Sequence, residues 1–305
     1  MSYQIIQHDR VTWTNIIQPT PSDVERLGKA YTMFHPLDLE DCLSRIERPK
    51  IEGYENYMFI VMHFPRWDKR RRISTPSEVD FFVGSGFVVT IHEGALKPLV
   101  NLFDLCQESD EARKQHLGRG ASRLLHTISD RLVDYLFPIL YKVDANIRTI
   151  EENLFEEDGQ RIIQDISFVR RDIISLRRIV RPQLPILENL ENVDRPFIRE
   201  DLDVYFGDIL DHLQKARDIV DDDAEVISSL ADTNDALQSH RINVVMRTLT
   251  VISVIMLPLT LIAGVLGMNV MIPFSEDPLT LWVIMGSMLL MSVFMLIYFR
   301  YRGWI

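Results

Sequence analysis

A polar tripeptide stands at the end of a long uncharged stretch near the carboxyl end of the chain. Thr248 to Leu266 holds no charged residue, and Gly267-Met268-Asn269 follows it directly. The Asn269 amide oxygen and the Gly267 carbonyl oxygen attract a cation through its water shell, without binding it as tightly as carboxylates do. A helix C-cap is a second role that fits Asn269, and the two roles are compatible. The tripeptide is therefore the first candidate for chemistry.

Two stretches are long enough to cross a membrane, at about 246–267 and at 279–299, because ~20 apolar residues span ~30 Å of hydrocarbon. The flanking cations are Arg241, Arg247, Arg300 and Arg302. The loop between the spans carries only the acidic pair Glu276 and Asp277. The positive-inside rule predicts a multi-pass protein of the cell (inner) membrane, in contact with lipid, with both termini in the cytoplasm. The acidic pair is then expected outside, where it attracts cations.

The first span is the better candidate to line a path for ions. Two helices are too few to enclose a water-filled path, so conduction needs several copies around one axis. Polar groups recur at helical spacing on this span, whereas the second span is apolar almost throughout. They are Thr250, Ser253, Thr260, Gly267 and Asn269. Hydroxyl groups in membrane helices often bond their own backbone instead, so both roles stay open for Thr250 and Ser253.

Charge and cysteine content narrow the classes of function. The net charge of −11 argues against nucleic acid as a partner, because phosphate binding needs a basic surface. Cys42 and Cys106 show no metal-binding spacing, so we expect two reduced thiols. The segment from Met1 to Trp13 has no apolar core of a signal peptide, so we expect the soluble part to stay in the cytoplasm.

The residues before the spans predict a cytoplasmic α/β domain followed by helices. Strand-length apolar runs flank Gly84-Ser85-Gly86, which predicts a β-hairpin. Further on, apolar residues at three- and four-residue steps predict one helix through about 124–157 and an antiparallel partner over 160–180. A long helix should begin at Asp203 and continue into the first span. The expected divisions are 1–95 (cytoplasmic α/β domain), 96–202 (cytoplasmic helical hairpin region), 203–267 (stalk helix and first span), 268–278 (outer loop), 279–299 (second span) and 300–305 (cytoplasmic tail).

The tripeptide, in the last turn of the penultimate span, resembles the Gly-Met-Asn signature of the CorA family of magnesium and divalent-cation channels. The run from Leu257 to Gly264 is similar to the family's Met-Pro-Leu-Thr-Phe-Ile-Ala-Gly segment. Similar patches begin at His35, Arg48 and Tyr205, so the resemblance extends over nearly the whole chain in the right order. Two segments depart from the family: the outer loop lacks Met-Pro-Glu-Leu, and two arginines replace the lysine run at the carboxyl end.

The resemblance implies an α+β membrane protein with an N-terminal α/β domain, a long stalk helix and two C-terminal transmembrane helices. It implies a funnel-shaped homopentamer that carries Mg²⁺, with Co²⁺ and Ni²⁺ as further cargo, and a tripeptide filter that acts on the hydrated ion. By the same resemblance, Leu249 and Leu257 form apolar constrictions, and Asp232 and Asn243 face the pore below the membrane. Thr260 is expected on the same pore side by its spacing.

The resemblance also implies that intracellular Mg²⁺ regulates the channel as well as being its cargo. In the family, Mg²⁺ between cytoplasmic domains holds the channel shut, and its loss lets carboxylates repel one another. Asp208 matches a sensing carboxylate, Asp68 is the candidate opposing ligand, and Asp211 is a further candidate. Other acidic residues on the helices, among them Asp130 and Asp134, are expected on solvated faces.

Two other functions stay open. The related ZntB group of zinc transporters usually carries Gly-Ile-Asn, so Met268 weighs against zinc as the cargo. A membrane-anchored cytoplasmic enzyme or receptor is the alternative from another class. The sequence shows no Gly-rich phosphate loop and no metalloenzyme spacing of His, Asp and Glu, so we expect a transporter and not an enzyme.

Overall fold

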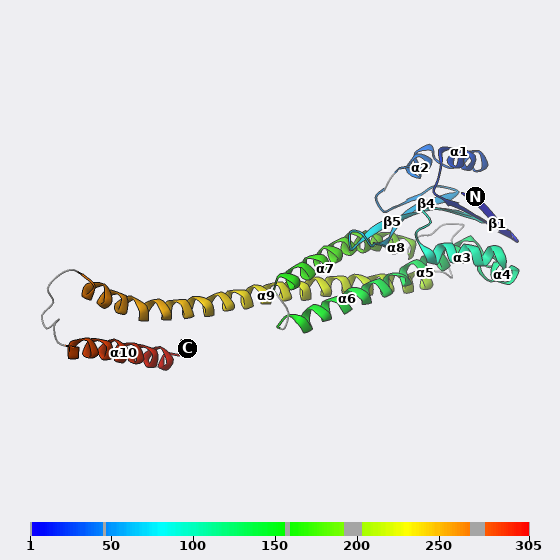
Figure 1. Cartoon of the computed structure of the whole chain (residues 1–305). Helices are drawn as coiled ribbons and strands as arrows, with labels where there is room; N and C mark the ends of the chain where they lie inside the picture. Colours follow the sequence, from blue (N-terminus) through cyan, green and yellow to red (C-terminus); the bar gives the residue numbers. More distant parts are fainter. Residues whose placement is uncertain (1, 45–46, 156–158, 192–202, 269–277, 305) are drawn as a thin grey trace. The chain divides into compact units, whose positions relative to one another are not determined.

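A computed structural model describes residues 2–44, 47–155, 159–191, 203–268 and 278–304 (Figure 1). The chain falls into two compact units, Met1–Ala231 and Asp232–Ile305. The first holds a sheet and most of the helices. The second holds the carboxyl-terminal part of one long helix and a final apolar helix.

The first unit contains a six-stranded sheet with the strand order β1-β2-β6-β5-β4-β3. The strands are β1 (Tyr3–His8), β2 (Val11–Ile17), β3 (Lys50–Gly53), β4 (Tyr57–Asp68), β5 (Ile73–Gly84) and β6 (Phe87–His92). Neighbouring strands are antiparallel except β2 and β6, which are parallel. The predicted hairpin is confirmed: Gly84 lies opposite Phe87, and Gly86 has a φ of 85°, which glycine adopts readily.

Helices cover both faces of the sheet (Figure 1). On one face lie α1 (Pro21–Ala30) and α2 (Pro36–Asp41), where Leu27 packs in a cluster with Phe59 and Phe82. On the other face, α5 (Ala121–Asp134) packs chiefly against β5 and β6, and α7 (Gly159–Val180) packs chiefly against β4 and β5. This two-sided cover explains why the middle of β4 is a continuous apolar run and does not alternate with polar residues.

The remaining helices of the first unit are α3 (Lys97–Glu108), α4 (Asp110–Leu117), α6 (Leu136–Asn153) and α8 (Leu184–Glu191), with a 3-10 turn, η1 (Arg181–Gln183). The single helix predicted through 124–157 was wrong, because α5 ends at Asp134 and α6 begins at Leu136. Pro138 explains the break, since its ring clashes with the carbonyl group four residues earlier, that of Asp134. The antiparallel pairing of α6 and α7 is confirmed (Figure 1).

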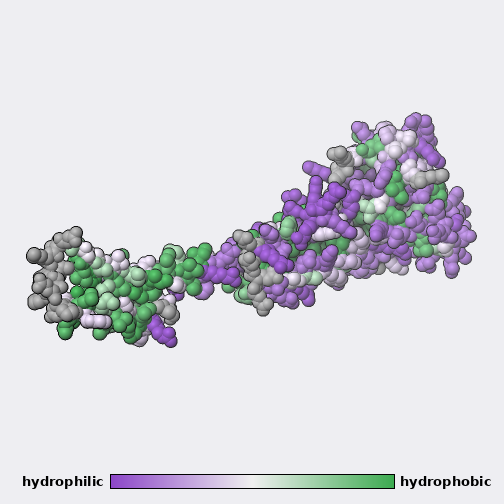
Figure 2. Space-filling view, in the orientation of Figure 1, coloured by the Kyte–Doolittle hydropathy of each residue, from purple (hydrophilic) through white to green (hydrophobic). Residues whose placement is uncertain are grey.

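The last two helices are α9 (Asp203–Leu266) and α10 (Pro278–Tyr301). As predicted, α9 is a single helix of 64 residues. Both are long and apolar enough to cross a membrane, and only 6% and 0% of their apolar windows are buried. A core helix of a soluble protein would be mostly buried, so this exposed apolar surface suits lipid. Figure 2 shows hydrophobic residues gathered over these segments, whereas the first unit is mostly hydrophilic outside.

Candidate functional site

The carboxyl end of α9 leads directly into the tripeptide. The Gly267 N–H donates to the Ala263 carbonyl oxygen at 2.9 Å, so this residue still belongs to the last turn. A Cβ atom at position 267 would lie 3.3 Å from that oxygen, a tight contact that glycine avoids. Asn269 and the acidic pair Glu276 and Asp277 lie outside the described residues. The part of the tripeptide that is described therefore stands at the end of a membrane helix.

One face of α9 carries the residues expected to line a pore. At ~100° per residue, Leu249, Ser253, Leu257, Thr260 and Gly267 fall within about a quarter of the helix circumference. A groove of about 730 Å³ runs along this face. Leu249 is 56% exposed and Leu257 is 70% exposed in the single chain. Such apolar surface becomes buried when lipid or further chains cover it.

The threonines Thr248, Thr250 and Thr260 of this segment all bond their own helix. The Thr260 hydroxyl donates to the Met256 carbonyl oxygen at 2.8 Å, and the Thr250 hydroxyl donates to the Met246 carbonyl oxygen at 2.7 Å. This bond uses the hydroxyl hydrogen and leaves the oxygen lone pairs as acceptors. Thr260 can therefore accept a hydrogen bond from the water shell of a passing ion while its backbone bond is intact.

Asp232 and Asn243 lie on α9 before the first candidate span, and both side chains are exposed. At ~100° per residue, their separation brings them to the same side of the helix. Exposed polar residues on one side of a helix are compatible with a water-filled path, and equally with a solvated surface.

Asp68 lies at the end of β4, where the chain turns towards β5. Its carboxylate accepts hydrogen bonds from the backbone N–H groups of Arg70 at 2.9 Å and Arg71 at 3.1 Å. The Arg71 hydrogen bond is the main cause of the lowered pKa of Asp68. Asp208 and Asp211 are exposed on α9. Among the described residues of one chain, no hydrogen bond or ion pair joins Asp68 to either of them.

The structure brings together three possible metal ligands from α5 and α9. Asp130, Asp134 and His212 each present one ligand atom, and these atoms lie within 4.8 Å of one another. Burial, and next the negative charge of Asp134, raises the pKa of Asp130. Two carboxylates at this separation repel each other, and a divalent cation between them would remove the repulsion. The donor set combines oxygen, which Mg²⁺ prefers, with imidazole, which suits Co²⁺, Ni²⁺ and Zn²⁺.

Asp208 lies near this cluster, one helical turn before His212, and its charge contributes to the raised pKa of Asp130. We had expected Asp130 on a solvated face, but it is only partly exposed. Phe206 of α9 packs on the His126 ring of α5, with centroids 5.6 Å apart, and so holds the two helices together here. Both helices carry ligand types four positions apart, a spacing that marks each pair as possible ligands but does not show that the two helices meet.

Comparison with known proteins places the chain in a family. The family model described as CorA-like Mg2+ transporter protein matches residues 8–301. The YfjQ protein of Bacillus subtilis is 32% identical over 98% of this chain and 92% of its own length. The cobalt/magnesium transport protein CorA of Thermotoga maritima is 31% identical over 96% of this chain and 83% of its own length.

The fold agrees with these matches. The complete structure of the CorA magnesium transporter from Methanocaldococcus jannaschii superposes with a TM-score of 0.86 at 22% identity, covering 98% of this chain and 94% of that one. The zinc transport protein ZntB of Pectobacterium atrosepticum is more distant, at 21% identity over 87% of this chain and 79% of its own length. With the family model matching nearly the whole chain, this protein belongs to the CorA-like Mg²⁺ transporter family.

Proposed function

We propose that this protein is an inner-membrane channel that carries Mg²⁺ into the cell, with Co²⁺ and Ni²⁺ as further cargo. The observation that carries the proposal is the end of α9, where an exposed apolar helix leads into Gly267 and the rest of the family's tripeptide. The family match over residues 8–301 supports the same function. Passage of an ion requires no covalent chemistry, so no catalytic step is part of the proposal.

The proposed assembly is a homopentamer in which one face of α9, the face that carries Ser253 and Thr260, lines the central axis. A pair of helices cannot enclose water, so the exposed stripe containing Leu249 and Leu257 must face copies of itself for conduction. The α10 helix then faces lipid, because almost its whole length is apolar and exposed. The five-fold number comes from the resemblance to the family.

The proposed selectivity filter is a ring of Gly267, Met268 and Asn269. Mg²⁺ loses its water shell reluctantly, so a fast channel should recognise the hydrated ion. Amide and carbonyl oxygens accept hydrogen bonds from that shell and bind weakly enough for the ion to leave. Glu276 and Asp277, close behind in the sequence, would raise the cation concentration at the outer mouth.

The proposed gate lies further inside. Leu249 and Leu257 are spaced to form apolar rings around a symmetric axis, and an apolar ring closes a pore by dewetting. Asp232, Asn243 and Thr260 then offer oxygen atoms to the hydrated ion on either side of these rings.

Regulation by intracellular divalent cations is proposed at the stalk. The carboxylates of Asp208, Asp211 and Asp68 are the ligands implied by the family resemblance. The cluster of Asp130, Asp134 and His212 adds a second set within one chain. A cation bound at these carboxylates stabilises the conformation that brings them together, and its loss releases their mutual repulsion.

Arg241 and Arg247 precede the first span, and Arg300 and Arg302 follow the second. Because arginines favour the cytoplasmic side of a membrane, the proposed topology puts both termini in the cytoplasm. An inside-negative potential then drives entry, since it contributes ~2.3 kcal/mol per charge per 100 mV.

Zinc transport is the second candidate. The imidazole of His212 is a ligand that Zn²⁺ accepts well, but the cluster belongs to the first unit and not to the membrane spans. Met268 of the tripeptide favours Mg²⁺, since the ZntB group usually has isoleucine there. Zn²⁺ is therefore a better candidate for a regulatory ion bound at the cluster than for the transported ion.

Mg²⁺ uptake into proteoliposomes with an inside-negative potential tests the proposal. An internal Mg²⁺-sensitive dye would follow entry for the natural chain and for Asn269→Ala, with Zn²⁺ and Co²⁺ as competitors. We expect Mg²⁺ entry that the variant loses. Ser287→Ala on α10 is the matched control, because the Ser287 hydroxyl donates only to its own helix, to the Ile284 carbonyl oxygen, and its loss should leave uptake unchanged. Zn²⁺ movement coupled to a proton gradient, without Mg²⁺ entry, would instead establish the zinc transporter.

A further inference from the structure

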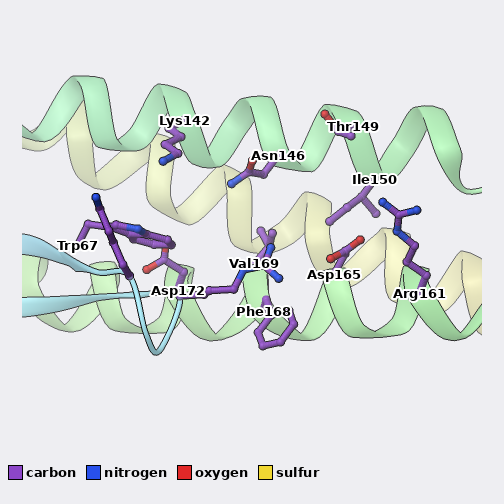
Figure 3. Close-up of a pocket in the computed structure, with 12 residues that line it drawn as sticks. Trp67, Lys142, Asn146, Thr149, Ile150, Arg161, Asp165, Phe168, Val169 and Asp172 are labelled. Carbon is purple, nitrogen blue, oxygen red and sulfur yellow. The ribbon is translucent and has the colours of Figure 1, made fainter.

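A cavity of about 660 Å³ lies between α6, α7 and the turn that joins β4 to β5 (Figure 3). Lys142 and Asn146 reach into it from α6, Asp165 and Asp172 reach in from α7, and Trp67 stands at one end. Pockets for small molecules usually measure ~300–1,000 Å³, so the size suits a ligand of that class.

The lining of the cavity is basic, in a chain whose net charge is −11. The cations are Lys69, Arg72, Lys142 and Arg161, and the only carboxylates among the lining residues are those of Asp165 and Asp172. Asp172 is buried and already accepts a hydrogen bond from the Ser74 N–H. Burial raises the pKa of Asp172. The excess positive charge therefore favours an anionic ligand.

Two of these cations are held in place by aromatic rings and not by carboxylates. The Lys142 ammonium lies 5.2 Å from the centroid of the Trp67 ring, and the Arg72 guanidinium lies 4.6 Å from that of Phe168. Within the described parts of the chain, Lys69, Arg72 and Lys142 make no ion pair. A contact with an aromatic face orients a cation but leaves its N–H groups able to bind an anion.

We propose that this cavity binds a nucleotide that carries a phosphate chain. Lys142 and Arg72, supported by Lys69, would hold the phosphates through charge-assisted hydrogen bonds. Trp67 is 37% exposed, which leaves ring surface on which a base can stack. The Asn146 amide, which offers both donors and an acceptor, can bond the edge of a base. An inorganic anion would use the cations but not the aromatic surface or the amide.

Calorimetric titration of the full chain in detergent micelles tests this inference. The probes are ATP, ADP, adenosine and inorganic tripolyphosphate, all with EDTA present so that divalent cations do not bind elsewhere. We expect ATP to bind more tightly than tripolyphosphate or adenosine. Binding of tripolyphosphate as tight as that of ATP would overturn the assignment, because the cavity would then recognise phosphate alone. No binding of ATP up to millimolar concentration would also overturn it.

Two conservative variants locate the site. Lys142→Gln should weaken ATP binding about tenfold or more, the factor expected when one charge-assisted hydrogen bond is lost. Trp67→Phe should remove the quenching of tryptophan fluorescence by ATP. Lys114→Gln, at an exposed lysine of α4 outside the cavity, is the matched control and should bind ATP like the natural chain. Unchanged affinity in Lys142→Gln would show that ATP binds elsewhere. Because binding is measured without transport, this result is separate from that of the uptake experiment.

Discussion

The Nδ1 atom of His212 lies 3.3 Å from a carboxylate oxygen of Asp134, across the contact between α9 and α5. With Asp130, the two residues form the three-ligand cluster of the first unit. The α9 helix continues without a break from His212 to Leu266, through the first candidate membrane span. A cation bound at the cluster would therefore fix the amino-terminal part of the same helix that carries the proposed pore residues.

We predict that Co²⁺ stabilises the protein through this cluster. A ligand that binds only the folded state at a hundred times its Kd stabilises by ~2.7 kcal/mol, which raises Tm. His212→Ala should remove most of the Co²⁺-dependent rise in Tm, since imidazole is a favoured Co²⁺ ligand. His240→Ala is the matched control, because His240 is exposed further along α9. An equal rise in His212→Ala and in the natural chain would show that Co²⁺ binds elsewhere.

Stability should fall in acid because of His92 on β6. Burial lowers the pKa of His92 to about 4, from an ordinary value of 6.5. The neutral ring is well placed: Nε2 lies 3.0 Å from the Asn15 amide oxygen, and Nδ1 accepts the Gly94 N–H at 3.0 Å. The unfolded chain therefore binds the proton more readily. The contribution of His92 is fully present above pH 6.5 and is lost as pH falls towards 4, by up to ~3 kcal/mol at 1.36 kcal/mol per pKa unit.

Replacing the ring tests this cause. His92→Gln keeps a donor and an acceptor but does not titrate, so the free energy of unfolding should depend less on pH between 6.5 and 4. His240→Gln, at an exposed position, should keep the natural slope. Denaturant unfolding at several pH values measures both. If His92→Gln and the natural chain lose stability in parallel, another group is responsible.

Asp223 on α9 should have the opposite effect. Burial, and next the charges of Asp144 and Asp222, raises the pKa of Asp223 to about 6. It is 7% exposed, and one of its carboxylate oxygens has no hydrogen-bond partner among the described residues. The folded state therefore binds the proton more tightly than the unfolded chain does. Stability from this group is greatest near pH 4 and falls as pH rises through 6, by up to ~3 kcal/mol.

The substitution Asp223→Asn removes the buried charge while keeping the shape of the side chain. It should raise the free energy of unfolding at pH 8 and have little effect near pH 4. Asp235→Asn, at an exposed position of the same helix, is the control and should change little at either pH. A variant that is less stable than the natural chain at pH 8 would contradict the assignment of a buried, ionised carboxylate.

The sequence predicts those elements that local patterns determine. The α9 helix follows from a long stretch without glycine or proline, and the β5–β6 hairpin follows from two apolar runs around Gly84-Ser85-Gly86. The position of Asp130 next to His212 could not be predicted in this way, because it depends on which faces of α5 and α9 meet. The cavity beside Trp67 depends likewise on how the β4–β5 turn packs against α6 and α7, which are distant from it in sequence. The break at Tyr135 was predictable from Pro138. The apolar periodicity continues across the break, however, and so favoured a single helix.

The proposed gate makes a last prediction, at Leu257. This side chain is apolar and 70% exposed in the single chain, and it lies on the face of α9 that carries Thr260 and Gly267. If rings of Leu257 close the pore by dewetting, then Leu257→Ser should wet the constriction and let ions pass in the closed state. We expect Mg²⁺ flux at high internal Mg²⁺ to rise by about tenfold or more, which corresponds to a barrier lowered by ~1.4 kcal/mol. Leu281→Ser on α10 is the matched control, since Leu281 is 65% exposed on the helix proposed to face lipid. An equal flux in Leu257→Ser and in this control would place the gate elsewhere, because a constriction that excludes water must respond to a hydroxyl group at its narrowest ring.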